Sequence, residues 1–168
     1  MKNILLIGCG HMGGSLMSGW SNSKNYTISV IDKKKYSILK KRNRNKKIKF
    51  FKSIDDIDNK NNLDYIIFAT RPLELTNVFK ELKNANFNKK SIAISVIAGK
   101  TTEIFKKNLL NISKIVRVMP NMPALIGEGV HCIYTNKSIN KKEIKEIDKL
   151  FSLSGKTLFF NSETFIDK

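Results

Sequence analysis

The stretch that decides the fold is Ile4-Leu5-Leu6-Ile7-Gly8-Cys9-Gly10-His11-Met12-Gly13, an apolar run that leads directly into three spaced glycines. The apolar residues predict a buried strand, and Leu16, Met17 and Trp20 follow the glycines at helical spacing. In such a strand, loop and helix, the first glycine makes a tight turn, the second lets the backbone approach a pyrophosphate, and the third lets the helix pack on the strand. The stretch therefore predicts a dinucleotide site, and a glycine-rich turn without a ligand is the alternative. Its predicted cofactor-binding residues are Ile7, Gly8, Gly10, His11, Met12 and Gly13.

Length and composition predict a single globular domain. The chain has 168 residues, of which 41% are hydrophobic, and no run reaches the roughly 18 apolar residues that a membrane helix needs. The N-terminus has no secretory segment, so we expect a cytoplasmic protein without a membrane partner. Cys9 and Cys132 have the spacing of neither a disulfide framework nor a zinc site, and no metal is expected.

The net charge of +17 raises nucleic acid as a partner. The densest basic run, residues 40–47, contains no aromatic residue, and most of the positive charge of the chain is lysine. Specific nucleic-acid readers depend on arginine and on interleaved aromatic side chains. A solvated face is therefore favoured over a nucleic-acid patch, and no nucleic-acid partner is expected.

Strand and helix patterns alternate along the chain and predict parallel βαβ units. The predicted fold is a Rossmann-type, doubly wound α/β domain over residues 1–161, with a mostly parallel sheet and helices on both faces. Strands are predicted at 26–31, 48–51, 64–70, 91–97, 114–118, 129–135 and 156–160, after the first strand. Helices are predicted at 36–42, after a Ser53 cap, from Pro72, from Thr101 or Thr102 to Leu110, and from an Asn140 and Glu143 capping box to Leu153.

Asp32 ends the strand predicted at 26–31, about 20 residues after the glycine loop. An acidic side chain in this place accepts a hydrogen bond from a ribose 2′-hydroxyl and favours NAD(H). Lys33, Lys34 and Lys35 follow at once, and they suit the 2′-phosphate of NADP(H) instead. We expect NADPH or NADH as the cofactor, leaning slightly toward NADH, and a simple turn residue is the alternative role of Asp32.

Two further loops leave the same edge of the predicted sheet, where open α/β sheets bind their ligands. They add Ala69, Thr70, Arg71 and Pro72 after one strand, and Ile97, Ala98 and Gly99 after the next. Arg71 suits a phosphate or a substrate carboxylate, and a surface residue is the equal alternative. Neither His11 nor His131 has an Asp or Ser spaced for a triad, so packing or surface roles are favoured for both.

Asn121 lies between Pro120 and Pro123 at the end of the strand predicted at 114–118. Two prolines so close together stiffen the loop and fix one amide side chain at the ligand edge of the sheet. We therefore predict a functional task for this amide.

Four stretches together resemble the pyrroline-5-carboxylate reductases, a family that makes L-proline. They are IGCGHMGGSLMSGW at 7–20, ATRP at 69–72, SVIAGKTTEIF at 95–105 and KIVRVMPNMPALIGEGV at 114–130. The resemblance implies a Rossmann domain that binds NAD(P)H, followed by a helical domain that dimerises and completes the active site. It implies hydride transfer to the imine carbon of 1-pyrroline-5-carboxylate, with protonation at nitrogen. It places residues 8–13 at the pyrophosphate, residues 69–72 and 97–99 at the nicotinamide, and Asn121 beside the reacting ring as the candidate catalytic residue.

The chain departs from the family pattern at three places. Arg71 replaces the usual Lys, and Met122 stands where Thr is common. Residues 162–168 coincide with the start of the connection to the helical domain, whose substrate loop does not follow. We therefore expect little turnover from this chain alone, and a homo-oligomer only for a complete chain. A non-catalytic dinucleotide-binding module and a 3-hydroxyacid or prephenate-type dehydrogenase remain the alternatives.

Overall fold

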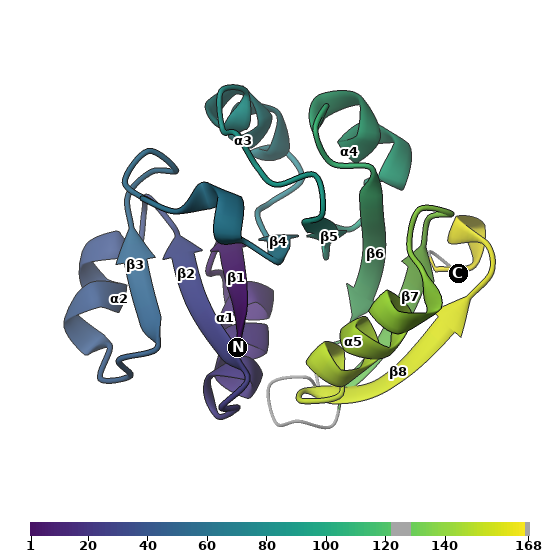
Figure 1. The fold of residues 1–168 in the computed structure, drawn as a ribbon. Coiled ribbons are helices and arrows are strands. Elements are labelled where there is room, and N and C mark those ends of the chain that lie inside the picture. The colour runs from purple at the N-terminus through teal and green to yellow at the C-terminus, as the bar shows by residue number, and fades with distance from the viewer. Residues whose placement is uncertain (122–128, 167–168) are drawn as a thin grey trace.

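The structure is a computed structural model that describes residues 1–121 and 129–166. Its strands form one sheet in the order β3-β2-β1-β4-β5-β6-β7-β8 (Figure 1). The strands are β1 (Lys2–Ile7), β2 (Tyr26–Ile31), β3 (Ile48–Phe51), β4 (Tyr65–Phe68), β5 (Ile92–Ser95), β6 (Lys114–Pro120), β7 (Gly129–Thr135) and β8 (Gly155–Phe160). The helices are α1 (His11–Ser21), α2 (Tyr36–Arg42), α3 (Leu75–Leu82), α4 (Thr102–Asn108) and α5 (Lys141–Phe151), with 3₁₀ turns at Lys60–Asn62 and Glu163–Phe165.

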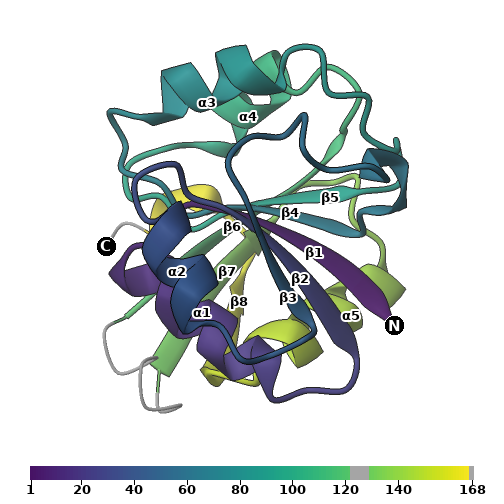
Figure 2. The same ribbon diagram turned by 90° about the vertical axis from the view of Figure 1, so that its left-hand side faces the viewer.

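Helices cover both faces of the sheet. Figure 2 shows α3 and α4 above the sheet and α1, α2 and α5 below it. On the α3 and α4 face, the rings of Phe68, Phe79 and Phe105 pack together with centroids 5.1 to 6.0 Å apart. On the other face, Trp20 of α1 meets Phe151 of α5 edge to face at 6.1 Å. Two apolar cores therefore hold the sheet between its helices.

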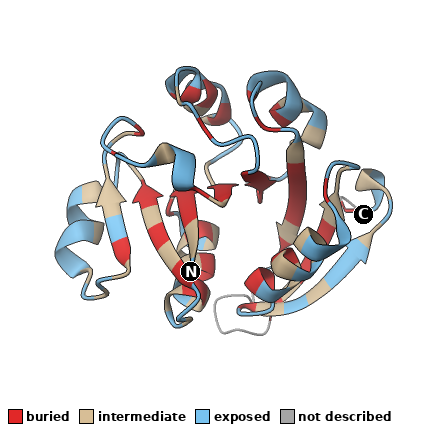
Figure 3. Cartoon of the chain, viewed as in Figure 1, coloured by how far each residue is buried: buried red, intermediate tan, exposed pale blue. Residues whose placement is uncertain are grey.

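All neighbouring strands run parallel except β6 and β7, which are antiparallel. The predicted Rossmann-type, mostly parallel fold is confirmed. Every residue of the central strands β4 and β5 is buried, as expected for strands covered on both faces, and exposure increases toward the edges (Figure 3). No helix within the described residues is long and apolar enough to span a membrane.

Several elements have the predicted bounds, among them β2, α2, β3 and β7. The capping box before α5 is confirmed. The Asn140 side chain accepts the Glu143 N–H at 3.0 Å, and the Glu143 carboxylate accepts the Asn140 N–H at 3.0 Å. Two unpaired amides at the start of the helix are thereby satisfied.

The helix predicted after Ser53 is wrong, because residues 52–59 form turns. Ile54 and Ile57 are buried as that prediction required, but the Asp56 carboxylate accepts the N–H groups of Lys52 and Ser53 at 3.2 and 3.0 Å. A short acidic side chain that bonds nearby backbone amides stabilises a turn in place of a helix.

One predicted helix start and one predicted side-chain cap differ from the structure, although α4 itself begins at Thr102 as predicted. Pro72 lies in a turn, and α3 begins only at Leu75. At α4 neither Thr101 nor Thr102 provides a side-chain cap. The Glu163 carboxylate instead accepts the Thr102 N–H at 2.7 Å and the Thr102 hydroxyl at 2.8 Å. A residue 61 positions away therefore caps this helix.

Candidate cofactor-binding site

The ends of four parallel strands lie in register at one edge of the sheet. Ile31 pairs with Ile7, Ile7 with Phe68, and Phe68 with Ser95. The loops that follow β1, β2, β4 and β5 therefore leave the sheet side by side. The structure thus brings together the predicted glycine loop, Asp32, residues 69–72 and residues 97–99 at one edge.

Gly8 and Gly13 make the close contacts expected of the glycine loop. Gly8 has a φ of +92°, and a Cβ on it would lie 2.7 Å from the carbonyl oxygen of Ala69. A Cβ on Gly13 would lie 2.3 Å from the carbonyl oxygen of Gly8, so α1 packs directly on the loop. No other residue type fits at either position without moving the backbone.

Gly10 differs from these two glycines. It precedes α1 as its N-cap, and a Cβ on it would meet nothing within 4 Å. The fold therefore leaves open space beside Gly10, next to the helix N-terminus that favours negative charge. His11, exposed, and Met12, half-buried, begin α1 at this opening.

The Asp32 carboxylate holds the glycine loop in place. Its Oδ2 accepts the Cys9 N–H at 2.8 Å, and its Oδ1 accepts the Lys35 N–H at 3.0 Å. The Lys35 ammonium then donates to the Cys9 carbonyl at 3.1 Å. Asp32 thus has the turn role that the sequence left open. Since each carboxylate oxygen has further acceptor capacity, a bond from a ribose hydroxyl remains a proposal.

A pocket opens between the ends of β1, β2 and β4 and the side of α3. Its apolar wall includes Ile7, Ile31 and Val78, and its rim carries charged side chains of both signs. Thr70 also lines it, and the Thr70 hydroxyl is buried without a hydrogen-bond partner. A buried hydroxyl without a partner in a pocket wall fits a site for a polar ligand group.

The other predicted residues lie around this edge. Ala69 is half-buried and its N–H continues the β1 ladder to the Ile7 carbonyl, whereas Arg71 and Pro72 are exposed. Ile97 is buried, and Ala98 and Gly99 are exposed in the loop after β5.

Asn121 is exposed at the end of β6. Its Oδ1 accepts the Val130 N–H at 2.9 Å, so its amide is held against β7, and the functional task predicted for it stays a prediction. Met122 and the remainder of that motif, residues 122–128, lie outside the described residues.

The two histidines do not meet at a site. His11 is exposed on α1, whereas His131 is buried in β7, where its Nε2 lies 2.9 Å from the Ser154 hydroxyl.

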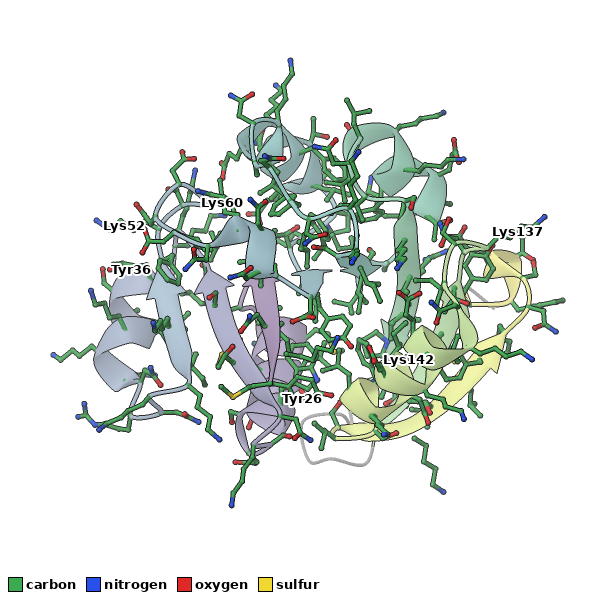
Figure 4. All side chains as sticks on the ribbon, in the orientation of Figure 1. Tyr26, Tyr36, Lys52, Lys60, Lys137 and Lys142 are labelled. Carbon is green, nitrogen blue, oxygen red and sulfur yellow. The ribbon has the colours of Figure 1, made fainter. Side chains whose placement is uncertain are left out.

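The basic run at 40–47 lies on α2 and in the loop before β3, and α2 buries no residue. Figure 4 shows Lys52 beside Tyr36, and the ammonium groups of Lys40 and Lys52 lie 5.3 and 5.5 Å from the centre of that ring. The predicted solvated role of this run stays a prediction.

A family model described as NADP oxidoreductase, coenzyme F420-dependent, matches residues 3–99, which is more than half of the chain. The chain belongs to this family. In this member of the NADP oxidoreductase family, the matched residues run from Asn3 of β1 past the end of β5 and include every predicted cofactor-binding residue.

Curated and solved proteins extend the match. The pyrroline-5-carboxylate reductase of Haemophilus influenzae is 31% identical in an alignment of 121 residues that covers 68% of this chain and 44% of that protein. The structure of a pyrroline-5-carboxylate reductase from Coxiella burnetii has a TM-score of 0.82 at 26% identity, covering 98% of this chain and 61% of that one. A prephenate dehydrogenase from Aquifex aeolicus has a TM-score of 0.74 at 17% identity, over 96% and 60% of the two chains, and shows likeness of fold alone. The chain spans about half the length of the curated relatives it matches.

Two residues that shape the pocket were not predicted from the sequence of this NADP oxidoreductase family member. Glu74 and Glu81 line the pocket, and each forms an ion pair with a lysine that follows β2. Their spacing of seven residues, two helical turns, was the available signal, because it places both carboxylates on one face.

Proposed function

We propose that this chain is the cofactor-binding part of a pyrroline-5-carboxylate reductase and binds NADPH or NADH at the glycine-loop edge of the sheet. The observation that carries this proposal is the open space beside Gly10 within a loop whose other two glycines are tightly packed. The buried Thr70 hydroxyl without a partner supports it, as does the named activity of the relatives.

The backbone of the loop and of the first turn of α1 would hold the pyrophosphate. The N–H groups at residues 11–13 have no carbonyl earlier in the helix to bond, and the helix dipole adds partial positive charge there. Residues 69–72 and 97–99 would line the nicotinamide end, and Asn121 would present its amide to the reacting ring. When bound, the reduced nicotinamide supplies the hydride that reduces the imine of 1-pyrroline-5-carboxylate.

Hydride transfer also requires the imine carbon to be held about 3–3.5 Å from its donor. We propose that residues 162–168, of which 167–168 lie outside the described residues, begin the connection to a helical dimerisation domain that holds the substrate. This chain then binds cofactor but turns over little substrate by itself, and homo-oligomerisation belongs to the complete reductase. The fraction of each relative that the chain covers supports this division.

A cytoplasmic location belongs to the same proposal. It is supported by the two cysteines, Cys9 and Cys132, which are both free thiols as in proteins of reducing compartments.

Isothermal titration calorimetry of the chain with NADPH and with NADH tests the proposal, with Gly10→Asp as the paired variant. At least one cofactor should bind the unaltered chain well below millimolar concentration. Because a Cβ at Gly10 would meet nothing within 4 Å, Gly10→Asp should keep the circular dichroism spectrum and lose binding. Failure of both cofactors to bind would reject the proposal. Reductase turnover by the chain alone would reject the division of labour, and a preference for hydroxyacid over imine substrates in a complete protein would favour the dehydrogenase alternative.

A further inference from the structure

Three consecutive lysines follow β2 beside the predicted ribose position, and each is paired with an acceptor of this chain. The Lys33 ammonium lies 2.6 Å from Glu81 Oε1, and the Lys34 ammonium lies 2.6 Å from Glu74 Oε1. Lys35 donates to the Cys9 carbonyl at 3.1 Å. The sequence suggests that these lysines could bind a 2′-phosphate, but in the fold each of them bonds to another group of the chain.

The two glutamates come from α3, across the pocket from the end of β2. Glu74 is the N-cap residue of α3 and Glu81 lies two turns further along. Both line the same pocket as Asp32, Lys33 and Lys34. The charged lining thus consists of three carboxylates and two ammonium groups, although the chain as a whole carries a charge of +17.

The hydrogen bond from Lys34 lowers the pKa of the Glu74 carboxyl below its ordinary value and so favours its charged form. Both pairs are partly exposed to solvent, with side-chain exposures of 58% and 40% for Lys33 and Glu81, and 77% and 39% for Lys34 and Glu74. Pairs this exposed are individually weak, so we expect a modest effect on a ligand, to which both pairs contribute.

We propose that Glu74 and Glu81 determine the cofactor specificity of this site by holding Lys33 and Lys34 away from a 2′-phosphate. A 2′-phosphate entering the pocket must take the lysines from the glutamates and approach three carboxylates. A ribose 2′-hydroxyl meets neither obstacle and can donate a hydrogen bond to the Asp32 carboxylate, which can accept a further one. The site therefore favours NADH over NADPH. In this preference the chain differs from its family, which is described as using NADP.

This inference rests on the proposed cofactor binding and is tested by calorimetry with NADH and NADPH, which needs no substrate. The informative variant is Glu74→Gln combined with Glu81→Gln, because glutamine keeps the side-chain length and an acceptor oxygen while removing the negative charge. The unaltered chain should bind NADH more tightly. The double variant should raise the affinity for NADPH relative to NADH by about tenfold at low ionic strength, and this gain should shrink in high salt.

Glu103→Gln on α4 is the matched control, because Glu103 is exposed and does not line the pocket. It should leave the ratio of the two affinities within about twofold of the unaltered chain, as expected for a distant exposed charge. An unchanged ratio in the double variant, or an equal gain for both cofactors, would overturn this inference while leaving the proposed function intact. Absence of binding by either cofactor would overturn the proposed function and this inference together.

Discussion

Asn121 and Val130 join the end of β6 to the start of β7 through two hydrogen bonds. The Asn121 Oδ1 accepts the Val130 N–H at 2.9 Å, and the Asn121 N–H donates to the Val130 carbonyl at 3.3 Å. The side-chain oxygen is therefore committed to the strand pair, and the NH₂ group is the part of this amide that remains for a ligand.

Asn121→Asp and Asn121→Ala separate these two roles. Aspartate keeps an acceptor for Val130, so it should leave the free energy of unfolding within about 0.5 kcal/mol of the unaltered chain. Alanine removes the acceptor and should lower it by about 1 kcal/mol in urea titrations. If the NH₂ group faces the nicotinamide, both variants should weaken cofactor binding in calorimetry. Normal binding by the aspartate variant would limit Asn121 to its structural role.

Gly13→Ala and Gly14→Ala test the packing of α1 on the glycine loop. A Cβ at Gly13 would lie 2.3 Å from the Gly8 carbonyl oxygen, whereas one at Gly14 meets only the Cys9 sulfur at 3.9 Å. We expect Gly13→Ala to lower the free energy of unfolding by about 2 kcal/mol or more, since α1 must move off the loop. Gly14→Ala should be neutral or stabilising by about 0.5 kcal/mol, because alanine favours the helix. Equal effects of the two substitutions would contradict this packing.

His131 should make the stability depend on pH. Burial lowers the pKa of His131 below its ordinary value of 6.5, although a hydrogen bond with the Ser154 backbone opposes the shift. The unfolded chain therefore binds a proton that the folded chain does not, so the free energy of unfolding is highest above about pH 6.5 and decreases as the pH falls below it. Urea titrations of the unaltered chain and of His131→Gln between about pH 7.5 and 5.5 measure this difference. Identical pH slopes for the two proteins would exclude the contribution.

Glu163→Gln should destabilise the fold through Arg117. Arg117 of β6 is 1% exposed, and its Nη1 lies 3.6 Å from Glu163 Oε1, the carboxylate that also caps α4. Glutamine can still accept the Thr102 N–H, but it leaves less negative charge near a buried guanidinium. We expect a loss of about 2 kcal/mol of unfolding free energy in urea titrations. The exposed Glu103→Gln should change it by under about 0.5 kcal/mol, and a similarly small effect of Glu163→Gln would refute the role of this pair.

Local sequence patterns predicted the strands well because burial on both faces of a sheet demands unbroken apolar runs, as in β4 and β5. They failed after Ser53, because the spacing of Ile54 and Ile57 suits a turn held by Asp56 as well as a helix. At the candidate site, the glycine loop could be predicted because its strand, its glycines and its helix follow one another along the chain, although Gly8 also packs on the Ala69 carbonyl.

The partners of the charged groups could not be predicted from the sequence in the same way. Glu74 and Glu81 meet Lys34 and Lys33 across 40 and 48 residues, and Glu163 meets Thr102 across 61. Such pairs depend on strand order, which places α3 beside the end of β2 only once β1 lies between β2 and β4. From the sequence alone, Asp32 favours NAD(H) and the lysines after it favour NADP(H). Only the fold shows which side chains surround these groups.

The contact between Trp20 of α1 and α5 joins the N-terminal and C-terminal parts of the chain, on the face of the sheet opposite α3 and α4. The indole N–H of Trp20 donates to the Leu150 carbonyl at 3.0 Å across 130 residues, and Gly19 packs against the Leu153 carbonyl. The helix that begins at the glycine loop therefore cannot detach without breaking contacts of the β7-α5-β8 segment. The molecule should open as one cooperative unit in native-state hydrogen exchange, so that a ligand bound at the glycine loop also slows exchange in α5.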